Sequence, residues 1–162
     1  GSDNILRRMN KGFTAEQASQ TLKNASEVGL RNIICLIAGY PHETQEDIKN
    51  SVDFIKKNKD YILKVSINNF YIDYGSSIHR NPKSYGVENL TLLPTYPWFS
   101  YNESGGLKWE QKQKQQEDNA RQIIKAVYKY ARFKRKMNLF SLYCAKSFEQ
   151  IIAKIKKACL SI

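Results

Sequence analysis

The sequence Ile33-Ile-Cys-Leu-Ile-Ala-Gly-Tyr-Pro41 decides the fold class of this chain. Its first six residues are all apolar, and a continuous run of this length is typical of a parallel strand covered on both faces. The run ends at the turn-forming residues Gly39 and Pro41. It is the longest wholly apolar run in the chain, and it falls far short of the roughly 20 apolar residues that a membrane-spanning helix needs.

Helices are predicted upstream of this strand. Thr14-Ala-Glu-Gln17 has the pattern of a capping box, in which the Thr and Gln side chains satisfy backbone N–H groups at a helix start. Gly29 stands where a left-handed helix end is favoured. We therefore predict a helix from about residue 15 to 28, preceded by a short helix that is capped by Ser2 or Asp3.

A βαβ unit is predicted downstream. Thr44, followed by carboxylates in the positive first turn, begins a helix that continues to Lys59. A strand at residues 63–71 follows, and the two strands of such a unit are expected to be parallel. Ligands are then expected beyond the carboxyl ends of the strands, at residues 39–43 and 69–78.

The remaining chain divides into two parts. Residues 73–106 are rich in Gly, Pro, Ser, Asn and aromatic residues, which predicts a loop layer that either packs or binds a ligand. Residues 107–162 predict two amphipathic helices, split near Met137-Asn138. Their apolar stripes are Ala120, Ile123, Ile124, Val127, Tyr128 and Ala131 in the first, and Phe148, Ile151, Ile152, Ile155, Cys159 and Ile162 in the second. The expected parts are thus an α/β part at 1–72, a loop layer at 73–106 and a helical extension at 107–162.

The net charge of +11 is unevenly distributed. Residues 1–106 carry 12 Lys and Arg against 11 Asp and Glu, whereas residues 107–162 carry 14 against 4. The helical extension is therefore strongly basic. A basic segment of this kind fits a nucleic acid or an acidic partner, but it equally fits the solvated side of two Lys-rich helices.

The residues alone identify neither a catalytic nor a metal-ligating group. No Gly-rich phosphate loop, Cys-x-x-Cys pair or His-x-x-x-His pair occurs, and His42 and His79 lack the spacing of metal ligands. Cys35 is expected to be buried in the strand and Cys159 on the apolar stripe of a helix. For Cys144 an exposed position remains an alternative to burial. Three scattered cysteines and the lack of a basic-then-apolar leader predict a reduced, cytoplasmic protein.

Three segments, in this order, resemble the second half of the catalytic barrel of radical S-adenosylmethionine enzymes. They are Gly1-Ser-Asp-Asn-Ile-Leu-Arg-Arg-Met-Asn-Lys-Gly12, Ile37-Ala-Gly-Tyr-Pro-His-Glu-Thr44 and Tyr74-Gly-Ser-Ser-Ile-His-Arg-Asn-Pro-Lys-Ser-Tyr-Gly86. The resemblance is to the subgroup that carries a cobalamin-binding domain ahead of the barrel, and it covers residues 1–88.

The resemblance rests on matched positions in each segment. These are Gly1, Ser2, Asp3, Leu6, Met9, Lys11 and Gly12 in the first, Gly39, Tyr40, Pro41, Glu43 and Thr44 in the second, and Gly75, Ser76, Ile78, Asn81, Pro82, Tyr85 and Gly86 in the third. His42 stands where the family usually has Gly, so the turn after the strand is expected to differ in shape.

The resemblance implies a partial TIM-type (β/α) barrel with parallel strands. In the intact enzyme it implies a reduced 4Fe-4S cluster that cleaves S-adenosylmethionine to a 5'-deoxyadenosyl radical, and it leaves open whether cobalamin is used. The Cys-x-x-x-Cys-x-x-Cys loop that ligates this cluster is absent from the sequence. We therefore interpret the chain as a C-terminal fragment that is inactive and without cofactors alone, whose partner in the parent protein is the missing N-terminal half of the barrel.

The resemblance also implies that the chain forms a wall of the cofactor and substrate pocket. The expected residues are Ile37, Gly39, Tyr40 and Pro41 against the adenine, Lys11 or Arg8 toward the cofactor carboxylate, and Asn69, Tyr71 and Tyr74 toward the substrate. Each has an ordinary alternative, such as core packing for Ile37 and Tyr71 and a solvated charge for Lys11.

A second hypothesis is a non-enzymatic RNA- or protein-binding module. Its basic helices would contact RNA or an acidic protein, and Trp98, Phe99, Tyr101 and Trp109 would offer stacking surfaces. No RNA-binding motif occurs in the sequence. In a fragment, the strand at 33–38 would keep an unpaired edge. We therefore expect a homodimer or larger assembly, with apolar residues of this strand or of the helix at 120–131 in the contact.

Overall fold

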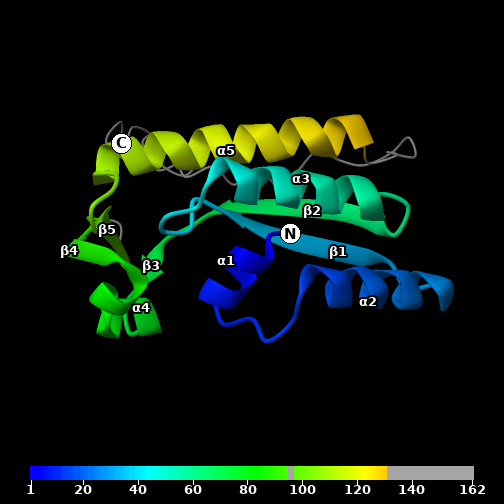
Figure 1. Ribbon diagram of the computed structural model, residues 1–162, viewed down its shortest axis with the longest axis horizontal. Helices are drawn as coiled ribbons and strands as arrows, with labels where there is room; N and C mark the ends of the chain where they lie inside the picture. The colour runs from blue at the N-terminus through cyan, green and yellow to red at the C-terminus, as the bar shows by residue number, and fades with distance from the viewer. Residues whose placement is uncertain (95–96, 131–162) are drawn as a thin grey trace, which may run out of the picture.

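The computed structural model describes residues 1–94 and 97–130. Figure 1 shows α3 and α5 along one side of a parallel sheet, α1 and α2 along the other side, and a small second sheet at one end. The elements are, in chain order, α1 (Asp3–Arg8), α2 (Ala15–Glu27), β1 (Asn32–Ala38), α3 (Gln45–Asn58), β2 (Ile62–Asn69), β3 (Ile72–Asp73), α4 (Ser77–Arg80), the short 3-10 helix η1 (Pro82–Tyr85), β4 (Val87–Leu92), β5 (Trp98–Glu103) and α5 (Trp109–Tyr130).

The helices begin where their capping residues predict. The Thr14 hydroxyl accepts a hydrogen bond from the Gln17 N–H, and the Gln17 side chain accepts one from the Thr14 N–H. Thr44 and Asp47 make the same reciprocal pair at the start of α3, and the Ser2 hydroxyl caps α1. The structure therefore confirms the three predicted helix starts. They could be predicted because capping contacts lie within one helical turn.

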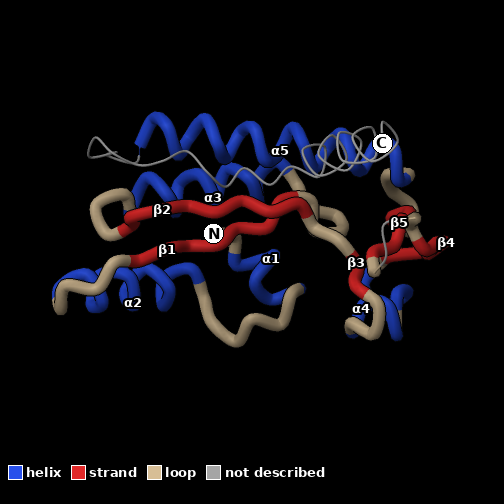
Figure 2. Tube along the Cα trace, turned by 180° about the vertical axis from the view of Figure 1, so that it is seen from behind, coloured by secondary structure: helices blue, strands red, loops and turns tan. Residues whose placement is uncertain are grey.

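β1 and β2 form the predicted parallel pair, joined by α3. Their register places Ile34 beside Val65, Ile37 beside Asn68, and Ala38 beside Asn69. Figure 2 shows the two strands side by side along their whole length. Among the described residues this sheet has two strands and no closed barrel forms.

One face of this sheet is well covered, and the other is only partly covered by α1 and α2. Ile34, Leu36 and Ala38 pack against residues of α3 and α5, among them Ile48 and Ile123. The alternate residues point away from this core, and Ile33 is 59% exposed.

The expectation that the strand is covered on both faces, with Cys35 buried, is therefore wrong. Cys35 is exposed. The helices that the structure describes pack mainly on the face of Ile34 and Leu36. An apolar run shows that both faces of a strand are apolar, but it does not show that other residues cover both faces.

Residues 73–106 are more regular than the predicted loop layer. β3, β4 and β5 form an antiparallel sheet in the order β3-β5-β4. Along β5 the side chains of Phe99, Tyr101 and Glu103 are buried and alternate with less buried ones. The prediction missed this sheet because its strands are short and separated by Pro and Gly residues, so that little alternation is visible in the sequence.

α5 is the helix that covers the sheet together with α3. Ile123 and Val127 are buried as predicted, but Tyr128 is 53% exposed, and Ala126 occupies the buried stripe instead. The predicted second helix, the break near Met137-Asn138, and the positions of Cys144 and Cys159 lie outside the described residues. No helix in the part that the structure describes is long and apolar enough to cross a membrane.

Candidate functional site

The turn after β1 is the centre of the site. Gly39 has a φ of +83° and His42 a φ of +56°, so the chain reverses sharply between β1 and α3. The Gly39 N–H donates to Glu43 Oε2 at 2.6 Å, and the Glu43 N–H donates to the Tyr40 carbonyl at 2.9 Å. The turn is therefore closed by its own residues. His42 takes up the left-handed conformation that favours Gly. This agrees with the sequence resemblance, in which His42 stands where the similar family usually has Gly.

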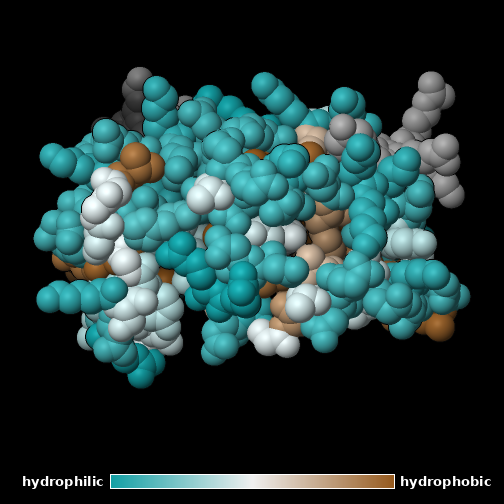
Figure 3. Space-filling model, viewed as in Figure 1, coloured by the Kyte–Doolittle hydropathy of each residue, from teal (hydrophilic) through white to brown (hydrophobic). Residues whose placement is uncertain are grey.

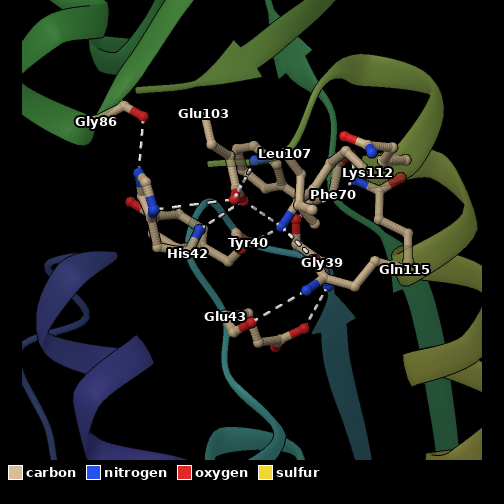
Figure 4. A network of polar contacts seen from close by, with 12 residues as sticks. Gly39, Tyr40, His42, Glu43, Phe70, Gly86, Glu103, Leu107, Lys112 and Gln115 are labelled. Atoms are coloured by element: carbon tan, nitrogen blue, oxygen red, sulfur yellow. Dashed lines mark hydrogen bonds and ion pairs between the residues drawn. The ribbon is translucent and has the colours of Figure 1, made fainter. Parts of the chain in front are cut away.

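The first turns of α5 place polar side chains against this turn (Figure 4). Lys112 is 0% exposed, and its Nζ lies 3.0 Å from the Tyr40 carbonyl oxygen and 2.6 Å from Glu103 Oε1. Gln116 donates to the Phe70 carbonyl at 2.9 Å, and Asn119 donates to Glu43 Oε2 at 2.8 Å. This row of Lys112, Gln116 and Asn119, which we call the polar row, ties α5 to the carboxyl ends of both parallel strands.

Glu103, from the end of β5, completes the contacts around the turn. Its Oε1 also accepts the His42 N–H at 2.7 Å, so one carboxylate oxygen bridges Lys112 and the turn. The His42 ring lies across from the second oxygen, with Nδ1 3.8 Å from Glu103 Oε2. On its other side, Nε2–H donates to the Gly86 carbonyl at 2.9 Å.

Burial and hydrogen bonding move the pKa values of the three buried charges in different directions. Burial raises the pKa of Glu43, and the hydrogen bonds from Gly39 and Asn119 offset only part of this. Burial lowers the pKa of Lys112, which the hydrogen bond with Glu103 only partly offsets. For Glu103, burial is outweighed by the hydrogen bonds from Lys112 and the His42 N–H, so its pKa lies below the ordinary value.

A cavity of about 550 Å³ opens at the carboxyl ends of β1 and β2. It brings together four of the expected pocket residues, Ile37, Tyr40, Asn69 and Tyr71. Its lining also includes Met9, Asn68, Asp73, Ser76, Ser77 and Tyr85. We call it the strand-end cavity; its walls combine aromatic rings with amide, hydroxyl and carboxylate groups.

The other expected residues lie elsewhere. Lys11 lines a neighbouring cavity of about 630 Å³ that runs along β1, which we call the edge cavity. The Arg8 guanidinium lies 5.7 Å from the centre of the Tyr40 ring, and the Tyr40 hydroxyl donates to the Arg8 carbonyl. Gly39 and Pro41 are buried and line neither cavity, and Tyr74, 63% exposed, packs on the His79 and Phe99 rings.

The aromatic residues suggested as stacking surfaces for RNA mostly pack against the chain itself. Phe99 and Tyr101 are buried. Trp98 stacks on Tyr71 with ring centres 4.7 Å apart, and Trp109 packs on Tyr101.

Sequence reasoning missed the polar row and Glu103. A signal for the row does exist: Lys112, Gln116 and Asn119 extend the stripe of Ile123 backward at helical spacing. Polar side chains on such a stripe are ordinarily expected to be exposed, so the pattern does not by itself indicate burial. Nothing in the sequence indicated Glu103, whose burial depends on a partner in another element.

A 4Fe-4S cluster does not fit the described residues. They contain no group of His, Cys, Asp or Glu side chains that could hold a metal ion, and Cys35 is the free cysteine among them. Cluster ligation needs several thiolates brought together, and the described residues do not provide them.

Partial matches link the chain to curated proteins. A protein named as an uncharacterized methyltransferase, from Pyrococcus horikoshii, is 36% identical over 56 residues, which is 35% of this chain and 12% of that protein. Two proteins named ribosomal protein uS12 methylthiotransferase RimO match over 60 residues, 36% of this chain and 14% of theirs. The one from Flavobacterium johnsoniae is 40% identical and the one from Flavobacterium psychrophilum 38% identical. The chain therefore matches only a small part of each relative. No family model and no solved structure matches it.

Proposed function

We propose that this chain is the C-terminal part of a radical S-adenosylmethionine enzyme and that the strand-end cavity is a wall of its cofactor and substrate pocket. The observation that carries the proposal is the meeting of Ile37, Tyr40, Asn69 and Tyr71 on one cavity at the ends of two parallel strands. Ligand sites in parallel α/β folds lie at this edge. The partial similarity to a methyltransferase and two methylthiotransferases supports an enzyme that uses S-adenosylmethionine.

The strand-end cavity suits part of a nucleoside-sized ligand. Its volume of about 550 Å³ is that of an ordinary small-molecule site. The Gly39 N–H and the Gly39 and Tyr40 carbonyls are already bonded within the chain. An adenine would therefore contact the Ile37 side chain and the Tyr40 ring, and it would find its polar partners at Asn68 or Asn69 rather than on that backbone.

The edge cavity continues this site toward Lys11. Met9, Ile37 and Asn68 line both cavities, so the two are adjacent. A ligand that extends from the strand-end cavity past Met9 would bring its carboxylate near Lys11. We assign Lys11 rather than Arg8 to that contact, because Arg8 is held at the Tyr40 ring and lines neither cavity.

The radical chemistry is assigned to another part of the parent protein. In that parent protein, cysteines outside this chain would hold the cluster, which would supply the electron for cleavage of the cofactor. The residues described here bind and orient the ligand and exclude water from it. The proposal does not depend on cobalamin.

Ligand binding by the purified chain tests the pocket. S-adenosylmethionine should raise its melting temperature, because a ligand that binds only the folded state stabilises it. The Asn69→Ala variant should lose this shift, whereas Asn50→Ala, which alters an exposed amide on α3, should keep it. An equal shift in both variants, or none in the unchanged chain, would contradict the proposal.

Activity of the chain tests the fragment assignment. After anaerobic treatment with iron and sulfide, the chain should stay colourless and produce no 5'-deoxyadenosine, since its sequence lacks the cluster loop. A brown protein with a cluster absorption band, or measurable 5'-deoxyadenosine, would overturn the assignment.

A further inference from the structure

The polar row of α5 is unusual because its buried side chains satisfy backbone groups of the turn. The three protons of Lys112 Nζ have three acceptors: Glu103 Oε1 at 2.6 Å, Gln115 Oε1 at 2.8 Å and the Tyr40 carbonyl at 3.0 Å. No described buried side-chain nitrogen or oxygen lacks a hydrogen-bond partner. Each buried polar side chain of the row therefore has its hydrogen-bond partners within the chain.

Lys112 and Glu103 hold both halves of the turn between β1 and α3. Lys112 bonds to the Tyr40 carbonyl, and Glu103 accepts the N–H of His42, two residues later. Between them stands Pro41, which is itself buried. The position of the Tyr40 ring thus follows from contacts made by α5 and β5, more than 60 residues further along the chain.

We infer that Lys112 is a positioning residue that fixes the Tyr40 turn at the wall of the strand-end cavity, so that α5 sets the shape of this cavity. The ligand-binding part of this inference rests on the proposed function, whereas the positioning of Tyr40 does not. Tyr40 connects the cavity with the polar row: it is one of the residues that line the cavity, and its carbonyl accepts a hydrogen bond from Lys112 of α5.

Stability alone does not account for a buried lysine here. Two charges removed from water gain little over well-packed apolar side chains of similar volume, because desolvation offsets their attraction. An apolar residue at position 112 would also fill this buried position. What the lysine adds is a donor directed at the Tyr40 carbonyl, and the helix would lose that contact with any apolar replacement.

The test separates charge balance from positioning. Lys112→Met leaves Glu103 buried without its charged partner, whereas the double variant Lys112→Met, Glu103→Gln removes both charges and keeps an acceptor for the His42 N–H. Lys114→Met, which alters an exposed lysine of α5, is the matched control. Each protein is labelled with 3-fluorotyrosine, and the 19F signal of Tyr40 is assigned by its loss in Tyr40→Phe. Urea unfolding reports stability.

We expect the double variant to regain most of the stability lost by Lys112→Met, but its Tyr40 signal to stay shifted or broadened. Lys114→Met should keep the unchanged signal. If the double variant or Lys112→Met shows the Tyr40 signal of the unchanged chain, Lys112 does not position the turn and the inference is wrong.

Binding of S-adenosylmethionine then distinguishes this inference from the proposed function. If the unchanged chain binds it, the double variant should bind it at least tenfold more weakly, while Lys114→Met keeps the affinity. If the unchanged chain does not bind it, the proposed function fails, and the Tyr40 signal still decides the role of Lys112.

Discussion

At the scale of single residues, the turn between β1 and α3 depends on two positions with positive φ. Gly39 meets two demands, because its φ is +83° and an added Cβ would overlap the Gln116 side chain. His42 also has a positive φ, of +56°, but there is room for its side chain, whose ring hydrogen-bonds to the Gly86 carbonyl. The site is thus shaped by one residue without a side chain and by one whose side chain joins the turn to the start of β4.

Gly39→Ala should destabilise the chain strongly. The left-handed backbone costs about 1–2 kcal/mol for a residue with a Cβ, and the overlap with Gln116 adds about 1–3 kcal/mol. Gly29→Ala is the matched control, since Gly29 has a φ of +82° but open space around it. Urea unfolding should show the larger loss for Gly39→Ala, and equal losses would contradict the close approach of α5.

Glu43 should make stability depend on pH. Because burial raises its pKa, the folded chain holds a proton on Glu43 at pH values where the unfolded chain has lost it. Its contribution should therefore rise as the pH falls from 7 toward the ordinary value of 4.5, by about 1.4 kcal/mol for each unit by which the pKa is raised.

Glu43→Gln provides the comparison for this pH dependence. The pKa values of Glu103 and Asp47 are lowered, so these groups act as the pH falls below their ordinary values, and they are common to both proteins. Measured by urea unfolding between pH 4.5 and 7.5, the stability of the unchanged chain should gain on that of the variant as the pH falls. A constant difference across this range would contradict a raised pKa.

At the scale of elements, α5 has two different buried surfaces. Its first half contacts the strand ends through the polar row, and its second half contacts the sheet through Ile123, Ala126 and Val127. The apolar half buries apolar surface against the sheet, and the polar half hydrogen-bonds to the turn after β1 and to the end of β2.

Ile123→Ala should cost about 2–5 kcal/mol of folding free energy, because Ile123 is buried against Ile48 and Ile55. Tyr128→Ala should cost less than Ile123→Ala, since Tyr128 is 53% exposed. Thermal unfolding of both variants checks this assignment of the stripe. A large loss for Tyr128→Ala would instead favour the stripe predicted from the sequence.

At the scale of the whole molecule, the described residues bury one face of the parallel sheet and cover the other only in part, so that apolar side chains such as Ile33 and Leu63 stay exposed. Figure 3 shows that the face seen there is largely hydrophilic, with small hydrophobic patches. β1 has no strand partner on its second edge among the described residues, and the edge cavity runs beside it. An unpaired apolar strand is a site for association.

We therefore predict that the chain alone forms a homodimer or larger assembly through β1. Light scattering at tens of micromolar should give a mass above 18.8 kDa, and Ile33→Lys should return the chain to a monomer, because a charge on an edge strand opposes pairing. Gln113→Lys, an exposed change on α5 away from β1, should not. A monomeric unchanged chain would refute the prediction.

The sequence by itself determined the features that depend on near neighbours. The helix starts at Thr14 and Thr44, the parallel pairing of β1 with β2, and the place where ligands are expected all follow from patterns within a few residues or from the handedness of a βαβ unit. For the same reason residues 39–43 and 69–78 could be expected together, and Tyr40, Asn69 and Tyr71 do line one cavity. Ile37, which lines it too, was expected only from the family resemblance.

Only the tertiary structure decided which polar groups are buried and which apolar groups are not. Lys112 meets the Tyr40 carbonyl 72 residues away, and Gln116 meets Gly39 across 77 residues, so neither burial is visible in a local pattern. Likewise Cys35 is exposed although its strand is apolar, because none of the described residues covers it. A side chain's hydropathy is local, but whether it leaves water depends on what the rest of the chain places against it.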